Sequence, residues 1–134
     1  IMPLMDTNFV NILYKCAIGK LNGDEEVLGS SKVSGCVIAA SKGYPENYDI
    51  GFPITFNCEE FKDVQIFHSG TSKDKEGKII TGGGRVLSIV CQGEDFDNAF
   101  DMAYKVLKNI NFAGIYYRKD IGHQVRKNYS YNET

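Results

Sequence analysis

The chain has 134 residues, a formal net charge of −2 and four cysteines. This length suits one domain with a sizeable core, and the nearly balanced charge gives no general attraction to nucleic acid or to anionic membranes. No apolar run approaches the roughly 18 residues that a membrane span needs, so we expect neither a nucleic-acid partner nor a membrane.

The first predicted element is an amphipathic helix near the start of the chain. Asp6 or Thr7 is a suitable N-cap, and Gly19 or Gly23 can end the helix. Apolar residues between these signals fall at helical spacing on one face: Phe9, Ile12, Leu13, Cys16 and Ala17. Residues 22–31 are polar and acidic, which indicates a loop after the helix.

Strands are predicted in the middle of the chain. The short apolar run 32–41 is typical of a buried strand. Residues 51–54 suit a brief edge strand, because they contain a proline, which cannot donate to a ladder. Residues 64–71 alternate between the two faces of a strand, so His68 is expected on the same face as Ile66.

A hairpin is predicted around residues 66–87. Two apolar runs flank the charged segment 73–78, which contains one glycine. Three glycines, 82–84, stand immediately before Arg85, and such a run lets the backbone turn sharply or lets another group approach closely. Arg85 begins a predicted strand that ends at Gln92. In it four residues are expected to share a face: Arg85, Leu87, Ile89 and Cys91.

The clearest helix is predicted at residues 94–110. Asp95 or Asp97 caps it. Its apolar stripe is typical of a helix that packs on a core: Phe96, Ala99, Phe100, Ala103, Val106, Leu107 and Ile110. The segment 111–122 is dense in tyrosine and in charge, and residues 125–134 are expected to form a polar, frayed tail.

Cysteine usage favours a reducing, cytoplasmic location. The four cysteines are widely spaced and form no C-x-x-C pair, so we expect neither a zinc site nor disulfides. Cys16, Cys36 and Cys91 stand among apolar residues, where a free cysteine behaves as a small hydrophobe. No secretory signal is visible, because the first residues lack a basic head and Asp6 interrupts them. The first residue is Ile1 rather than Met, which suggests a fragment or a removed start.

Familiar catalytic and cofactor-binding motifs are not found. The sequence has no phosphate loop of the form G-x-x-x-x-G-K-[ST], no G-x-G-x-x-G between strand and helix, and no H-E-x-x-H. Arg85 is the best candidate for binding an anion, because its planar guanidinium acts as a fork. The structural alternative is that Arg85 pairs with a carboxylate such as Asp120. A strand histidine such as His68 is most often a structural hydrogen-bonding group, and Arg118 to Asp120 most often form a surface ion-pair cluster.

Five short segments together resemble one known family. In chain order they are Met2-Pro3-Leu4, Ala39-Ala40-Ser41-Lys42-Gly43-Tyr44-Pro45, Phe67-His68-Ser69-Gly70-Thr71, Thr81-Gly82-Gly83-Gly84-Arg85-Val86-Leu87 and Tyr116-Tyr117-Arg118-Lys119-Asp120-Ile121-Gly122. Their order and spacing are similar to those in the C-terminal region of glycinamide ribonucleotide synthetase, also called phosphoribosylamine–glycine ligase, of the ATP-grasp superfamily. The resemblance covers most of residues 2–123, although Ser69 stands where the family pattern has alanine.

The resemblance implies a reaction and a fold. Such enzymes join glycine to 5-phosphoribosylamine in purine biosynthesis, through glycyl phosphate, with ATP converted to ADP and phosphate. The implied fold is α+β: residues 28–124 would form a small antiparallel barrel-sandwich, the rudiment of a hybrid motif, with a packed helix. Residues 1–27 would be the closing helix of the ATP-grasp fold with a linker, and residues 125–134 a tail or linker.

The resemblance also implies where the chemistry lies. The lobes that hold ATP and magnesium (or manganese) would precede this segment, so the chain alone is expected to have no catalytic residue, no metal ligand and no activity. Its expected part is a site for the ribose-phosphate substrate, formed by Arg85, Gly83 and Gly84, with Thr71 and His68 as further donors. Two alternatives stay open: a stand-alone module that binds a phosphorylated metabolite, and a purely structural domain that closes the upstream lobes.

Overall fold

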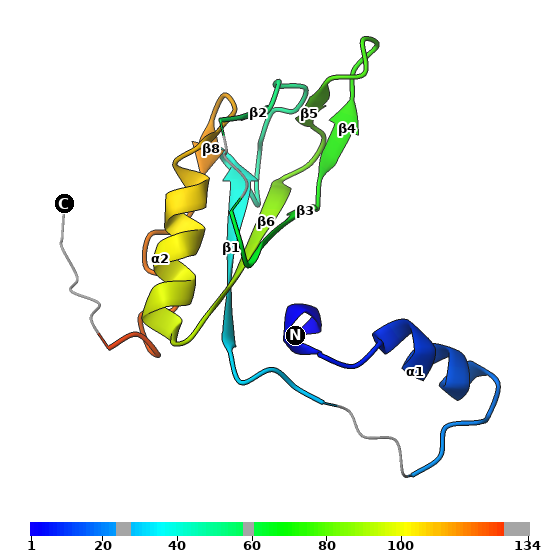
Figure 1. Ribbon diagram of the computed structural model, residues 1–134. Coiled ribbons are helices and arrows are strands. Elements are labelled where there is room, and N and C mark those ends of the chain that lie inside the picture. Colours follow the sequence, from blue (N-terminus) through cyan, green and yellow to red (C-terminus); the bar gives the residue numbers. More distant parts are fainter. Residues whose placement is uncertain (24–27, 58–60, 128–134) are drawn as a thin grey trace.

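The computed structural model of the protein describes residues 1–23, 28–57 and 61–127. Its centre is a four-stranded antiparallel sheet in the order β3, β6, β1, β8 (Figure 1). These strands are β1 (Val33–Ser41), β3 (Val64–His68), β6 (Arg85–Gly93) and β8 (Ile115–Tyr116). Two short ladders accompany the sheet: β2 (Thr55–Phe56) with β7 (Ile110–Asn111), and β4 (Thr71–Lys73) with β5 (Ile79–Thr81). The predicted α+β class with antiparallel strands is confirmed.

The helix α2 (Phe96–Leu107) packs on one face of this sheet and closes the core (Figure 1). Asp95 caps it, because its side chain accepts a hydrogen bond from the N–H of Asn98 at 2.8 Å. The predicted apolar stripe faces the sheet, and the buried residues of the helix are Ala99, Phe100, Ala103, Val106 and Leu107. The strands supply Val37, Ala39, Leu87, Ile89 and Cys91. Each large apolar side chain buried here stabilises the fold by roughly 1.5–3 kcal/mol.

The opposite face of the sheet, which we call the open face, carries exposed and half-buried side chains. Paired residues on neighbouring antiparallel strands share a face, and the register pairs Cys36 with Val90, and both Ile38 and Phe67 with Ser88. Phe67 is 47% exposed. The open face is therefore a surface on which a ligand or another part of a protein can be bound.

A β-bulge turns Arg85 onto this open face. Ala39 pairs with Leu87, but the next residue, Ala40, pairs with Arg85, so Val86 is an extra residue in β6. An extra residue interrupts the alternation of side chains, and Arg85 therefore lies beside Ala40 rather than on the core face. The prediction of a common face was wrong for Arg85. It was right for Leu87, Ile89 and Cys91, which are fully buried.

The N-terminal segment is hydrogen-bonded to the residues that precede β1. The N–H of Asp6 donates to the C=O of Leu28 at 3.1 Å, and the N–H of Leu28 donates to Oγ1 of Thr7 at 2.7 Å. Because Thr7 makes this contact, the cap of helix α1 (Phe9–Ala17) is Asn8, whose side chain accepts a hydrogen bond inside the first turn. The prediction of Asp6 or Thr7 as the cap was wrong by one or two residues.

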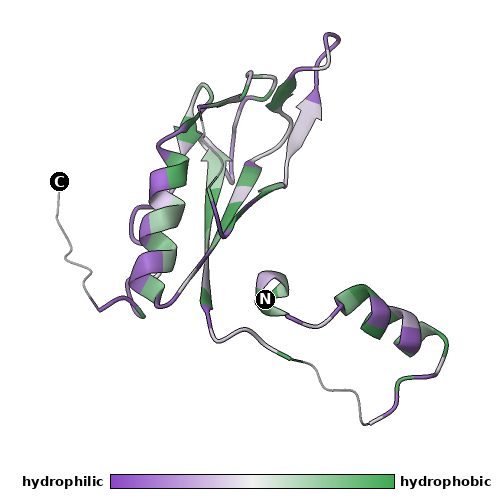
Figure 2. Cartoon of the chain, viewed as in Figure 1, coloured by the Kyte–Doolittle hydropathy of each residue, from purple (hydrophilic) through white to green (hydrophobic). Residues whose placement is uncertain are grey.

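Helix α1, which follows a short 3-10 turn, η1 (Met2–Leu4), buries none of its nine residues. Hydrophobic residues lie along it (Figure 2), and Val10, Leu13 and Tyr14 are all more than half exposed. Isolated helices of this length are marginal in water, so α1 gains stability when these side chains are covered. Neither helix of the described chain has the length and apolar character that crossing a membrane requires.

The predicted edge strand at residues 51–54 is not formed. Pro53 makes an isolated bridge with Ile80, and the strand β2 begins two residues later, at Thr55. The N–H of Ile54 still donates to the C=O of Ile79 at 3.0 Å. The segment therefore follows β5 closely without forming a regular ladder, which agrees with the inability of proline to donate.

The first residues of the tail, which was predicted to be frayed, are bound to helix α2. Arg126 is an ion-pair partner of Asp97 and Asp101 on α2, and its side chain is 10% exposed. The N–H of Lys127 also donates to Asp97, at 3.2 Å. The expectation of fraying was therefore wrong for residues 125–127, and residues 128–134 lie outside the described chain.

The described cysteines are free thiols. Cys91 is fully buried, whereas Cys16 and Cys36 are exposed. The predicted role of a packed small hydrophobe is therefore confirmed for Cys91 and was wrong for Cys16 and Cys36. Burial, together with the smaller effect of the neighbouring Cys36, raises the pKa of the Cys91 thiol to about 12. Cys58 lies outside the described residues.

We expect a thiol reagent to count four free cysteines when the protein is unfolded without a reductant. In the folded protein at mildly alkaline pH, Cys91 is expected not to react, because it is buried and its thiolate is disfavoured. A Cys91→Ala variant is the control, since it should lower the unfolded count by one and leave the folded count unchanged. A count of two or none in the unfolded wild type contradicts the expectation.

Candidate functional site

Arg85 lies in an open hollow beside the glycine turn 82–84. The hollow has a volume of about 550 Å³ and is lined by Ile38, Tyr44, Ser69, Gly70, Gly82, Gly83, Gly84, Arg85 and Ser88. We call it the glycine–arginine hollow. The structure therefore brings together Arg85, Gly83 and Gly84, three of the five residues that the sequence singled out.

Ser41, a buried residue at the end of β1, holds the glycine turn in place. Its N–H donates to the C=O of Gly84 at 2.8 Å, and its hydroxyl donates to the C=O of Gly83 at 3.0 Å. In a trans peptide the C=O and the following N–H point in opposite directions, so the N–H of Gly84 points away from Ser41. Gly84 is itself buried, and outside the strand ladders no backbone carbonyl of the described residues accepts from its N–H.

Two glycines fix the shape of the hollow. A Cβ on Gly84 would stand 2.0 Å from the ring of Tyr44. The ring can therefore pack on the turn only because residue 84 has no side chain. A Cβ on Gly70 would stand 2.4 Å from the backbone oxygen of Arg85. Gly70 also donates its N–H to the C=O of Val86, the extra residue of the bulge, at 3.0 Å. Gly70 thus connects the segment after β3 to the bulge in β6.

The positive charge of Arg85 has no partner within residues 1–23, 28–57 and 61–127. Its exposed side chain makes no hydrogen bond or ion pair with a described residue. Asp120, the alternative partner, is bound by Arg118, whose guanidinium donates to both carboxylate oxygens at 2.8 and 2.5 Å. This hydrogen-bonded contact lowers the pKa of the Asp120 carboxyl. The structural alternative for Arg85 was therefore wrong, whereas the expected ion pair within Arg118 to Asp120 is present.

Two serine hydroxyls form a further part of the wall. The oxygens of Ser69 and Ser88 lie 2.7 Å apart, and both residues line the hollow. The sequence interpretation did not select them, although Ser69 continues the alternation of β3 on the face opposite to His68. Hydroxyls beside a guanidinium form a donor set that suits a phosphate or a carboxylate.

The other two predicted site residues, His68 and Thr71, line a separate hollow of about 370 Å³. His68 pairs with Leu87, which places it on the core side of the sheet, away from Arg85. Nδ1 of His68 lies 3.0 Å from Oγ1 of Thr71, within hydrogen-bond distance. This contact matches the structural alternative for His68, and the structure does not bring the pair to Arg85.

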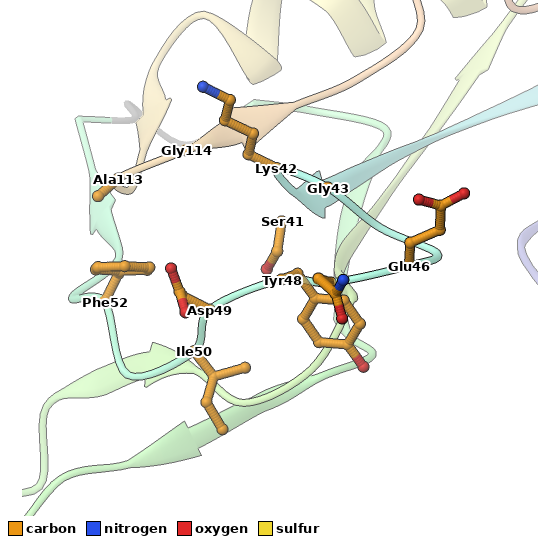
Figure 3. A pocket seen from close by; sticks show the side chains of 11 residues that line it. Ser41, Lys42, Gly43, Glu46, Tyr48, Asp49, Ile50, Phe52, Ala113 and Gly114 are labelled. Carbon is orange, nitrogen blue, oxygen red and sulfur yellow. The ribbon is translucent and has the colours of Figure 1, made fainter.

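A larger open hollow, of about 950 Å³, adjoins Ser41 and is formed by the loop after β1 and the loop before β8 (Figure 3). Figure 3 shows the carboxylate of Asp49 between Phe52 and Ser41. Glu46 adds a second carboxylate to the lining and Lys42 a single ammonium. This hollow is therefore less suited to an anion than the glycine–arginine hollow.

The described residues do not fit a metal centre. No group of three or more histidine, cysteine, aspartate or glutamate side chains gathers in the ranges 1–23, 28–57 and 61–127. Magnesium and manganese prefer sets of oxygen ligands, carboxylates above all. We therefore assign no step with a metal to these residues.

The fold and the glycine–arginine hollow define a class of protein. It is a small α+β domain with antiparallel strands, in which an arginine without a partner among the described residues lies beside a glycine turn. Comparison with known proteins gives the family. Residues 34–124 match the family described as phosphoribosylglycinamide synthetase, C domain, and the chain belongs to this family. The resemblance that the five sequence segments indicated is thereby confirmed.

The chain is similar over most of its length to proteins named phosphoribosylamine–glycine ligase. It is 46% identical over 121 residues to that of Caldanaerobacter subterraneus subsp. tengcongensis, covering 90% of this chain and 28% of the relative. It is 39% identical over 125 residues to that of Synechocystis sp., covering 92% and 30%. The crystal structure of the Thermotoga maritima ligase matches with a TM-score of 0.70 and 34% identity, covering 84% and 27%. The chain thus spans less than a third of the length of these relatives.

Proposed function

We propose that the chain is the C-terminal part of a phosphoribosylamine–glycine ligase, an ADP-forming carbon–nitrogen ligase of purine biosynthesis that works in the cytoplasm. In this reaction ATP phosphorylates glycine to glycyl phosphate and leaves ADP. The amine of 5-phosphoribosylamine then attacks the acyl carbon, and phosphate departs. The family match over residues 34–124 and the similarity to ligases of this name support the proposal.

The unpaired Arg85 in the glycine–arginine hollow is the observation that carries the proposal for this chain's own part. In the proposal its guanidinium binds the phosphate of 5-phosphoribosylamine through two charge-assisted hydrogen bonds. The hydroxyls of Ser69 and Ser88 supply further donors. Gly83 keeps the approach free of side chains. The hollow thus positions the ribose-phosphate substrate and performs no bond-making step itself.

We assign ATP and Mg²⁺ (or Mn²⁺) to ATP-grasp lobes outside residues 1–134. Residues 1–27 are assigned to the closing helix of that fold and its linker, and the uncovered apolar side chains of α1 support a neighbour there. Residues 28–124 are assigned to the C domain, with its sheets as a barrel-sandwich, the rudiment of a hybrid motif. Residues 125–134 are assigned to a tail or linker.

The purified 134-residue chain is expected to show no glycine-dependent ATP turnover, whereas the complete ligase that contains it forms glycinamide ribonucleotide. The measurement is ADP release with glycine and 5-phosphoribosylamine, each omitted in turn. Turnover by the chain alone that needs both substrates would contradict the assignment of ATP to other segments.

The second candidate function is a stand-alone module that binds a phosphorylated metabolite. It is favoured by one observation, that Arg85, the glycine turn and the two serines line one hollow within the C domain. The two candidates separate when binding of ribose 5-phosphate is measured alongside that activity assay. A complete polypeptide that binds ribose 5-phosphate but forms no glycinamide ribonucleotide supports the module.

A further inference from the structure

Arg85 also borders a second hollow on the open face, of about 250 Å³, which we call the tyrosine hollow. It is lined by Cys36, Ile38, Ala40, Tyr44, Arg85, Tyr116, Tyr117, Arg118 and Ile121. Ile38, Tyr44 and Arg85 line both hollows. A ligand that is held at Arg85 can therefore extend from the polar hollow into the aromatic one.

The sheet register explains the shape of the tyrosine hollow. Ala40 pairs with Arg85 on one side and with Tyr116 on the other, so the three side chains stand in a row across β6, β1 and β8 on one face. Neighbouring strands are about 4.8 Å apart, which separates the backbones of Arg85 and Tyr116 by about 10 Å. A guanidinium and a phenol ring thus form two walls above a floor made by the methyl group of Ala40.

The walls offer one unpaired charge and several aromatic rings. Of the two arginines in the lining, Arg118 is bound to Asp120, whereas Arg85 has no partner among the described residues. Tyr116 is 56% exposed. Tyr117 is anchored against the ring of Tyr104, with the centroids 6.2 Å apart. This combination suits a ligand with a single phosphate and a flat, uncharged ring, because aromatic side chains stack on nucleobases with little dependence on sequence.

We propose that the tyrosine hollow binds the base of a nucleoside 5′-monophosphate whose phosphate occupies Arg85. The proposal rests on the proposed function in one respect, since the same guanidinium would hold the substrate phosphate. A nucleotide bound in this way excludes 5-phosphoribosylamine from Arg85 and acts as a competitive inhibitor of the ligase. Ribose 5-phosphate, which has no base, uses the glycine–arginine hollow alone.

The test is calorimetric titration of the 134-residue chain with ribose 5-phosphate, adenosine and adenosine 5′-monophosphate. Stacking of one base strengthens binding by roughly five- to a hundredfold. The monophosphate is therefore expected to bind at least about fivefold more tightly than ribose 5-phosphate. Tyr116→Ala should remove this advantage and leave ribose 5-phosphate binding unchanged, whereas Tyr116→Phe should keep it.

Two further variants keep the test decisive. Ala40→Leu fills the floor of the hollow without removing a contact group, and it should weaken the monophosphate specifically. Tyr14→Ala, which removes an exposed tyrosine of α1, is the matched control and should change neither ligand. Thermal unfolding of each variant shows whether it is folded.

The outcomes separate this proposal from the proposed function. Equal affinity for the monophosphate and ribose 5-phosphate, or monophosphate binding that Tyr116→Ala does not change, overturns the nucleotide site and leaves the substrate site standing. Ribose 5-phosphate binding that is insensitive to Arg85→Ala contradicts the substrate site. Monophosphate binding that both Tyr116→Ala and Arg85→Ala weaken supports the nucleotide site in either case.

Discussion

Replacement of Arg85 by alanine in the complete ligase is expected to raise the Michaelis constant for 5-phosphoribosylamine by about ten- to a hundredfold. Loss of hydrogen bonds to a charged group costs roughly 1.5–3 kcal/mol, which corresponds to this change in affinity. The constants for ATP and glycine should change little, because we assign both substrates to other segments. The melting temperature should also be kept, because the exposed side chain of Arg85 has no partner in the described fold.

Arg118→Ala is the matched control, since it removes a second arginine from the same face of the domain. Arg118 is already bound to Asp120, and an exposed ion pair of this kind contributes little to stability. Its removal should leave the 5-phosphoribosylamine constant within about twofold of the wild type. Arg85→Lys keeps the charge but loses the planar fork, so it should restore binding in part. An unaltered constant in Arg85→Ala, or a loss explained entirely by unfolding, would return Arg85 to a structural role.

The elements with the strongest periodicity are those that the sequence predicted best. The helix predicted at residues 94–110 is α2, at Phe96–Leu107, and the strand predicted at 32–41 is β1, at Val33–Ser41. Both combine a clear apolar pattern with strong end signals, such as the Asp95 cap. The hairpin around 73–78 is also present, as the pair β4 and β5. Local patterns decide these elements because burial on one face and the turn chemistry point to the same answer.

The face of Arg85 could not be obtained in this way. Alternation from Leu87 back to residue 85 places the arginine in the core, and a single extra residue at Val86 reverses that result. The adjacent burial of Val86 and Leu87 is the structural mark of the bulge. In the sequence they are simply two neighbouring apolar residues. The bulge forms through bonds from distant segments, including the N–H of Gly70 to Val86, so it is a tertiary feature.

The composition of the site was predictable only in part, for a related reason. Arg85, Gly83 and Gly84 are neighbours in the chain, and the sequence placed them together correctly. Ser88 comes from the open face beyond the bulge, and Tyr44 comes from a loop about forty positions earlier in the chain. Neither has a local pattern that distinguishes it from other polar or aromatic residues. Contacts between segments so far apart are set by strand pairing rather than by local sequence.

Replacement of Gly70 by alanine is expected to lower the free energy of unfolding and to weaken anion binding together. The new Cβ would stand 2.4 Å from the backbone oxygen of Arg85 and 3.3 Å from Cα of Gly83, and backbone atoms cannot rotate away as a side chain can. Gly70 is also held in place, because its N–H donates to Val86 at 3.0 Å and its C=O accepts from Gly82 at 2.8 Å. The strain is therefore passed to the bulge and the glycine turn. Such overpacking typically costs about 1–3 kcal/mol, which urea unfolding measures.

Gly83→Ala is the matched control in the same hollow. Its Cβ would meet Gly70 at 3.5 Å, an ordinary van der Waals distance, so the free energy of unfolding should change by less than about 0.5 kcal/mol. Equal destabilisation by the two alanines would show that the turn needs flexible glycines generally, and not a close contact of Gly70 with Arg85. Because Arg85 reaches the open face through the bulge to which Gly70 is bonded, ribose 5-phosphate binding should fall in Gly70→Ala even below the onset of unfolding. A stable Gly70→Ala protein with unchanged ribose 5-phosphate affinity would show that this glycine does not position the arginine.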